Sequence, residues 1–107
     1  MSGRIVIVGY KPKPGKQAAL EALTRKHYKV LQEAELVSDR KPIAMKAIDG
    51  TIVEVFEWKS AEAIQQAHHH PAVLAMWGEY AEACDYIPVG AVPEAVNLFS
   101  EFTPFEI

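Results

Sequence analysis

The dipeptide Asp49-Gly50 separates two β-type runs and constrains the fold more than any other short segment of the chain. Residues 43–48 precede it and residues 51–58 follow it, and both runs contain β-branched side chains. An Asp-Gly pair between such runs is a strong signal for a β-hairpin, because a type I′ turn needs positive φ at both central residues. We therefore expect an antiparallel sheet built around this hairpin.

Both faces of the second strand in this hairpin are substantially apolar. One face carries Ile52, Glu54, Phe56 and Trp58, and the other carries Val53, Val55 and Glu57. A half-exposed antiparallel sheet alternates more cleanly between apolar and polar residues. We therefore expect helices on one face and a second copy of the chain on the other.

Two segments of helical spacing surround the hairpin. Apolar residues recur every three or four positions from residue 16 to about residue 37. A second helical region begins after Ser60, which is a suitable N-cap. Pro71 interrupts this region and suits the first position of a renewed helix, which is expected to run to Cys84.

The remaining β-type runs complete a recognisable order. Residues 5–8 and 95–102 are expected to be strands, and residues 103–107 a tail. The order strand-helix-strand-strand-helix-strand predicts an α+β, ferredoxin-like βαββαβ fold with a four-stranded antiparallel sheet. Its 107 residues are room for a single domain, 1–107.

Charge, cysteine content and hydropathy exclude several classes of protein. A net charge of −3 disfavours binding to nucleic acid. No apolar run approaches the roughly 20 residues that span a bilayer, so no membrane partner is expected. The single cysteine, Cys84, has no internal partner for a disulfide, which favours a cytoplasmic location.

Histidines are the most prominent polar candidates. His27 lies inside the apolar stripe of the first helix, where it is either a hydrogen-bonded structural residue or an acid/base group in a pocket. The run 68–70 is a poor metal site, because neighbouring side chains on a helix point about 100° apart and do not converge on one ion. It is either a helix break with one inward and two solvated histidines, or it supplies a pocket residue, His68 or His70.

Three other residues have both a structural and a functional interpretation. Glu54 would act as a base if buried, or would form an ion pair with Arg4, Arg40 or Lys46. Trp77 and Tyr80 lie one turn apart, where they either belong to the core or line a pocket for a flat aromatic ligand.

Two short motifs resemble one known family. Residues 13–16 (Lys-Pro-Gly-Lys), before the first helix, and residues 58–63 (Trp-Lys-Ser-Ala-Glu-Ala) resemble the antibiotic-biosynthesis-monooxygenase-like family of the dimeric α/β-barrel superfamily. The resemblance implies a homodimer whose two sheets pack as a barrel, with a ligand pocket between sheet and helices. It also implies oxidation of quinols or polyketide aromatics without metal or flavin, or haem degradation.

The haem-degrading branch of that family departs from this chain at its functional positions. Counted from the junction at Trp58, those positions hold Val8, Ala67 and Trp77 here. Quinol-oxidising members have a histidine where this chain has Ala67, with His68 one residue further on. The resemblance therefore favours the quinol-oxidising branch over haem cleavage.

Two functions follow as hypotheses. The first is a monooxygenase-like enzyme without a cofactor, acting on a small aromatic, phenolic or quinol compound. Its catalytic proton acceptor is His27 or His70, and its ligand-binding residues are Glu54, His68, Trp77 and Tyr80. The alternative is a homodimer without catalytic activity that binds a small apolar or aromatic ligand or serves as an accessory protein.

Overall fold

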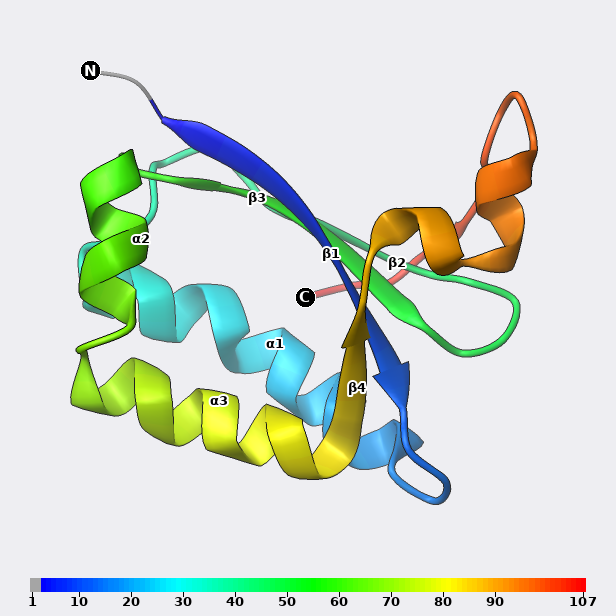
Figure 1. The fold of residues 1–107 in the computed structure, drawn as a ribbon, viewed down its shortest axis with the longest axis horizontal. Coiled ribbons are helices and arrows are strands. Elements are labelled where there is room, and N and C mark those ends of the chain that lie inside the picture. Colours follow the sequence, from blue (N-terminus) through cyan, green and yellow to red (C-terminus); the bar gives the residue numbers. More distant parts are fainter. Residues whose placement is uncertain (1–2) are drawn as a thin grey trace.

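The chain forms a small α+β structure, and the computed structural model describes residues 3–107. A five-stranded sheet in the order β4-β1-β3-β2-β5 carries the helices on one face (Figure 1), and its neighbouring strands pair antiparallel. No helix in the described part of the chain is both long and apolar enough to cross a membrane. The elements are β1 (Arg4–Pro12), α1 (Gln17–Glu33), β2 (Ile43–Lys46), β3 (Ile52–Trp58), α2 (Ala61–Ala67), α3 (Pro71–Ala83), β4 (Cys84–Ile87), the 3₁₀ turns η1 (Val89–Ala91) and η2 (Pro93–Val96), and β5 (Thr103–Pro104).

The hairpin centred on Asp49-Gly50 is confirmed, but its turn is not type I′. Gly50 has a φ of 92°, but Asp49 does not have the positive φ that a type I′ turn needs. Among residues 3–107, Glu35 is the only non-glycine residue with positive φ. The Gly50 N–H donates to the Ala47 carbonyl at 3.0 Å, and the Thr51 N–H donates to Asp49 Oδ1 at 2.9 Å. The aspartate therefore stabilises the loop through its side chain, and only the glycine needs the left-handed conformation.

The expected strand over residues 95–102 is wrong, and so is the expectation of four strands. Helix α3 ends at Ala83, and the next residues form β4, which pairs with β1. Residues 95–102 instead form part of η2 and an irregular loop. A fifth strand of two residues, β5, adds to the edge of β2.

Helices α2 and α3 are two separate elements. The Ser60 hydroxyl accepts a hydrogen bond from the Ala63 N–H at 3.1 Å, which confirms the predicted N-cap. Pro71 begins α3, and His70 precedes it in an extended conformation with ψ of 118°. A residue before proline avoids the helical region, so the chain changes direction here.

The main core lies between the helices and one face of the sheet. The pairing of Val6 with Phe56, and of Tyr10 with Ile52, puts alternate residues of β1 and β3 on this face. Leu20 and Leu31 of α1 and Val73 of α3 are fully buried against the core. The helical spacing of these residues was the signal for both helices.

The opposite face of the sheet is partly covered by the chain itself. Val92, between η1 and η2, packs with Ala47 and Val53 in a second small cluster. The prediction that this whole face lacks a cover within the chain is therefore wrong for the part next to Val53. Ile5 and Ile7 remain 57% and 51% exposed on β1.

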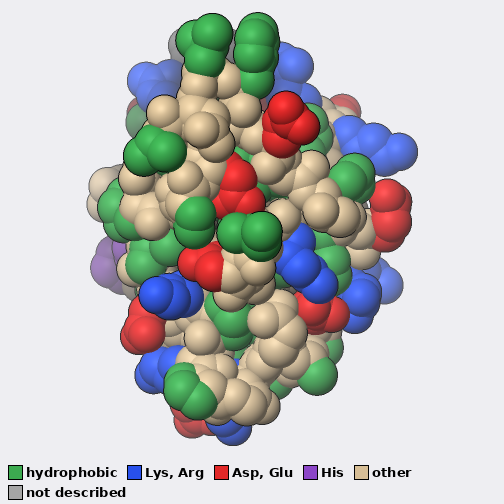
Figure 2. Space-filling model, turned by 90° about the vertical axis from the view of Figure 1, so that its right-hand side faces the viewer, with side chains coloured by type: hydrophobic (Ala, Val, Ile, Leu, Met, Phe, Trp, Pro, Cys, Tyr) green, Lys and Arg blue, Asp and Glu red, His purple; other side chains and the backbone are tan. Residues whose placement is uncertain are grey.

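A loop after η2 carries a group of exposed apolar side chains. Val96, Leu98 and Phe99 are 88%, 93% and 78% exposed, and we call residues 96–99 the apolar arm. In Figure 1 the arm extends away from the sheet, and hydrophobic side chains project at the same height in the turned view of Figure 2. Clustered exposed apolar side chains of this size are uncommon on the surface of a folded monomer.

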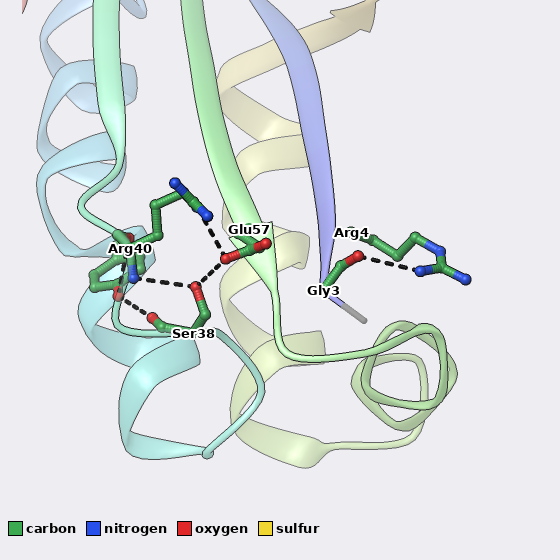
Figure 3. A network of polar contacts seen from close by, with 6 residues as sticks. Gly3, Arg4, Ser38, Arg40 and Glu57 are labelled. Atoms are coloured by element: carbon green, nitrogen blue, oxygen red, sulfur yellow. Dashed lines mark hydrogen bonds and ion pairs between the residues drawn. The ribbon is translucent and has the colours of Figure 1, made fainter. Parts of the chain in front are cut away.

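The carboxylate of Glu57, near the end of β3, is held in its charged form. Ser38 Oγ donates to Glu57 Oε1 at 2.7 Å, and Arg40 Nε donates to the same oxygen at 3.1 Å (Figure 3). The hydrogen bond from Ser38 and the interaction with Arg40 lower the pKa of Glu57 below its usual value of about 4.5. The network ties β3 to the chain between α1 and β2.

The lowered pKa of Glu57 predicts a loss of stability in acid. Because the folded-state pKa is below the unfolded value, the stabilisation is present above about pH 4.5 and is lost as pH falls through the folded pKa. We expect the melting temperature of Glu57→Gln to fall less between pH 5 and about pH 3 than that of the native protein. Thermal unfolding followed by circular dichroism checks this, and parallel curves for the two proteins would refute it.

Candidate functional site

A cavity of about 420 Å³ lies on the helix-bearing face of the sheet. Its volume falls within the roughly 300–1,000 Å³ typical of small-molecule sites. Alternate residues of β1 and β3 form its floor, and single residues of the helical layer and of β4 form its walls. These residues are Val6, Val8, Tyr10, His27, Phe56, Trp58, His68, Trp77 and Tyr86.

A buried carboxylate lies next to this cavity. Glu54 of β3 has no exposed surface, and Val8 of β1 lies opposite it. The Tyr10 hydroxyl donates to Glu54 Oε1 at 2.9 Å. His27 Nδ1 of α1 lies 2.9 Å from the same oxygen, although the ring N–H is poorly aligned with it. Since Tyr10 and His27 line the cavity and Glu54 does not, the carboxylate is a second layer behind them.

The tyrosines around Glu54 are held in the neutral form. Burial, and after it the negative charge of Glu54, raises the pKa of Tyr10 well above its usual value of about 10. Burial and Glu54 also raise the pKa of Tyr80. At the rim, burial raises the pKa of Tyr86 to about 12. Near neutral pH these hydroxyls keep their protons, so the imidazoles of His27 and His68 are the cavity groups that can accept one.

The other carboxylate oxygen has no donor of its own. Among the residues that the structure describes, Glu54 Oε2 is buried and makes no hydrogen bond. A buried carboxylate that is only half satisfied is costly, and it interacts strongly with any positive charge nearby.

His68 and Trp77, both candidate pocket residues, lie together in the cavity wall. The centroids of their rings are 5.3 Å apart and the rings are nearly perpendicular. His68 is exposed and Tyr86 is 51% exposed, so the cavity opens to solvent between β4 and the end of α2. Trp77 is partly buried and borders the cavity from α3.

The structure does not bring His70 into this cavity. His70 lies at the start of α3, in a separate groove that Lys26 and Glu79 also line. Tyr80 belongs to the core: it is fully buried, and its ring centroid lies 4.7 Å from that of Tyr10. Neither residue lines the cavity, so His27 is the one of the two proposed proton acceptors that does.

Glu54 does not form the alternative ion pairs that the sequence left open with Arg40 and Lys46. Those cations pair with other carboxylates: Arg40 with Glu57 at 3.1 Å and Lys46 with Glu21 at 2.8 Å. For Arg40 the strand geometry explains this, because Glu57 lies on the sheet face opposite to that of Glu54, whereas Lys46 pairs with Glu21 of α1.

Two tyrosines that line the cavity, Tyr10 and Tyr86, were not among the candidate site residues of the sequence. Tyr10 follows Val6 and Val8 at alternate positions of β1, and this period of two was a usable signal once the strand was extended past residue 8. Tyr86 lies in β4, a strand that the helical pattern before it concealed. Cys84 begins that strand, and burial raises the pKa of its thiol to about 11, so it is a poor nucleophile.

The described residues contain no cluster of side chains suited to bind a metal ion. Among residues 3–107, no group of three or more histidine, cysteine, aspartate and glutamate side chains comes together in a way that would hold an ion.

Comparison with known proteins gives information about the fold and not about the function. No protein-family model and no curated protein matches the chain. It is similar to the solved structure of Rv0793 from Mycobacterium tuberculosis, with a TM-score of 0.64 and 20% identity over 80% of this chain and 91% of that one. At that identity the similarity concerns the arrangement of helices and strands.

Proposed function

We propose that this protein oxidises a small aromatic, phenolic or quinol compound with molecular oxygen and without a cofactor. The observation that carries the proposal is His27, an imidazole in the wall of a largely aromatic cavity with the Glu54 carboxylate behind it. The two short motifs that resemble the antibiotic-biosynthesis-monooxygenase-like family support the same reaction class.

The reaction needs a base and a dry cavity more than it needs a redox group. His27 takes the proton of a phenolic O–H, and the resulting electron-rich anion donates electrons to O₂. For a quinol with a free ring position, one oxygen atom replaces a ring hydrogen and the other leaves as water. The product is a hydroxyquinone, and the ring supplies all four electrons that O₂ accepts.

The cavity wall favours a flat, uncharged ring. Phe56, Trp58 and Trp77 offer aromatic surfaces, and no lysine or arginine is among the residues that line the cavity. Aromatic rings pack favourably against one another in offset or edge-to-face geometry. His68 at the opening offers a polar contact for a second oxygen on the ring.

The proposed functional unit is a homodimer of ferredoxin-like subunits whose sheets face each other as in an α/β barrel. Two exposed apolar sets support a second copy as the partner: Ile5 and Ile7 on the outer face of β1, and the apolar arm. The arm follows the turns that cover part of that same face. A twofold contact on this side buries both sets at once, because each copy contributes the same surface.

A protein that binds its ligand without reacting is the second candidate. The observation that favours it is the hydroxyl of Tyr86, which burial keeps protonated at the rim of the cavity. Donors of this kind suit a quinone or ketone oxygen as well as they suit a phenol. This function predicts tight binding of an aromatic ketone with no turnover.

Oxygen consumption distinguishes the two. We expect uptake of O₂ with naphthohydroquinones at a rate above their spontaneous oxidation, measured against heat-denatured protein. Mass spectrometry after reaction under ¹⁸O₂ is expected to show one labelled atom in the hydroxylated product. If a broad panel of phenols and quinols gives no extra uptake while Trp fluorescence reports binding, the enzyme hypothesis is wrong and the binding protein is favoured.

A further inference from the structure

We infer that Glu54 is a positioning residue for His27: it holds the imidazole with Nδ1 inward, so that Nε2 is presented to the cavity as the proton acceptor. The identity of the proton donor rests on the proposed function. The statement about the imidazole does not, because it concerns the protein without ligand.

Two contacts converge on one oxygen of Glu54. Tyr10 donates its hydroxyl to Oε1 at 2.9 Å, and His27 Nδ1 lies 2.9 Å from the same atom. The three side chains come from β1, α1 and β3, so the packing of the helix on the sheet brings them together. All three are almost completely buried, with exposures of 2% for Tyr10, 3% for His27 and 0% for Glu54.

Tyr10 keeps the carboxylate of Glu54 in place. Burial and the charge of Glu54 both raise the pKa of Tyr10, so its hydroxyl stays protonated and can only donate to this acceptor. Its ring is in turn held by the ring of Tyr80, with centroids 4.7 Å apart. The oxygen that His27 approaches is therefore also held by a hydrogen bond from Tyr10.

The short distance to Glu54 selects one tautomer of His27. A lone pair on Nδ1 would lie against a carboxylate oxygen at 2.9 Å, which is repulsive, whereas an N–H there is attracted to it even with imperfect alignment. The neutral imidazole therefore carries its hydrogen on Nδ1. Its remaining nitrogen, Nε2, has a free lone pair, and His27 lines the cavity.

The same carboxylate balances the charge that His27 gains. When a phenolic O–H gives its proton to Nε2, the O–H bond breaks with its electron pair left on oxygen, and an N–H bond forms. Imidazolium then lies next to a carboxylate whose Oε2 has no donor among residues 3–107. An opposite charge in a buried site favours the charged imidazole strongly, so Glu54 promotes the transfer without touching the substrate.

Nitrogen NMR of the ligand-free protein tests this directly. With ¹⁵N-labelled histidine, and with His27→Gln used for assignment, we expect Nδ1 of His27 to show the shift of a protonated nitrogen and Nε2 that of an unprotonated one. In free imidazole side chains the Nε2–H form is the usual one, so the expected pattern is distinctive. An Nε2–H tautomer in the native protein would overturn the inference.

Two substitutions of Glu54 separate its charge from its position. Glu54→Gln keeps an acceptor and removes the charge, so we expect the tautomer to persist while kcat falls by about 10²-fold, at the low end of general-base effects, with KM little changed. Glu54→Met removes the acceptor, and we expect Nε2–H to become the main form. An unchanged tautomer in folded Glu54→Met, or an unchanged kcat in Glu54→Gln, would contradict the assignment.

Glu57→Gln is the matched control, because it is the same change on the same strand but on the face away from the helices. It is expected to leave both the His27 shifts and kcat as in the native protein. Should Glu54→Met fail to fold, the tautomer of the native protein still decides the question. Absence of oxygen uptake together with the expected native tautomer would reject the proposed function and leave the positioning role intact.

Discussion

Replacing His27 with glutamine is expected to slow oxygen uptake by about 10²–10⁴-fold, the usual contribution of a general base. Glutamine has no nitrogen that accepts a proton near neutral pH, but its amide still offers a donor to the buried Glu54 carboxylate. The fold is therefore expected to survive while the proton transfer is lost. Initial rates of O₂ consumption with a naphthohydroquinone measure the effect.

Two further variants define the specificity of that result. His27→Ala leaves the buried Glu54 without its histidine partner, and loss of one partner of a buried polar contact costs about 1–3 kcal/mol, so this variant is expected to be less stable as well as inactive. His69→Gln changes an exposed histidine outside the cavity and is expected to retain the native rate. Native turnover in folded His27→Gln would show that His27 is not the base.

The double substitution of Leu98→Ser and Phe99→Ser is expected to convert the proposed dimer into monomers. Both side chains are almost fully exposed in one copy, at 93% and 78%, so their apolar surface stabilises contacts with another molecule rather than the fold. Burying one such side chain contributes about 1.5–3 kcal/mol. A twofold contact contains four of them, so we expect the dissociation constant to rise by at least about 10³-fold.

Sedimentation velocity at micromolar concentration checks the change in mass. The matched control is Leu74→Ser on α3, a substitution of a 46% exposed leucine on the helical side of the molecule, which is expected to leave the dimer intact. The melting temperature of the arm variant also reports dimer loss, because dissociation removes the concentration dependence of unfolding. A monomeric native protein would contradict the proposed assembly.

Local patterns in the sequence predicted the elements that depend on local physics. The hairpin at Asp49-Gly50 and the two helical segments follow from turn chemistry and apolar spacing. The positions of the last strands were predicted wrongly, because apolar spacing is not specific to one kind of element. Cys84 continues the helical spacing of α3, although the helix ends one residue earlier, and residues 95–102 are apolar without being part of the sheet. Apolar character alone cannot distinguish a strand from a surface that a partner is expected to cover.

The site was predictable one residue at a time but not as a group. His27 and Glu54 each stood out as polar groups on apolar faces, and each was a candidate by itself. Their contact depends on how α1 packs across β3, which no local pattern records. His70 failed as a cavity residue because the proline after it redirects the chain, so its side chain joins the groove beside α1 and α3. Tyr10, in contrast, was not a candidate in the sequence, because only the pairing register of β1 with β3 places it next to Glu54.

A crystal structure with a bound 1,4-naphthoquinone tests the central claim most directly, since this product-like ring does not react with oxygen. We predict that the ring lies between Phe56, Trp58 and Trp77. One of its oxygens is expected within about 3.2 Å of Nε2 of His27, which is hydrogen-bond distance. Because a quinone oxygen only accepts, this contact requires the imidazolium form of His27, which would donate from Nε2 to the ligand while Nδ1–H stays against Glu54. A ligand bound elsewhere with the cavity empty, or bound with both oxygens turned away from His27, would contradict it.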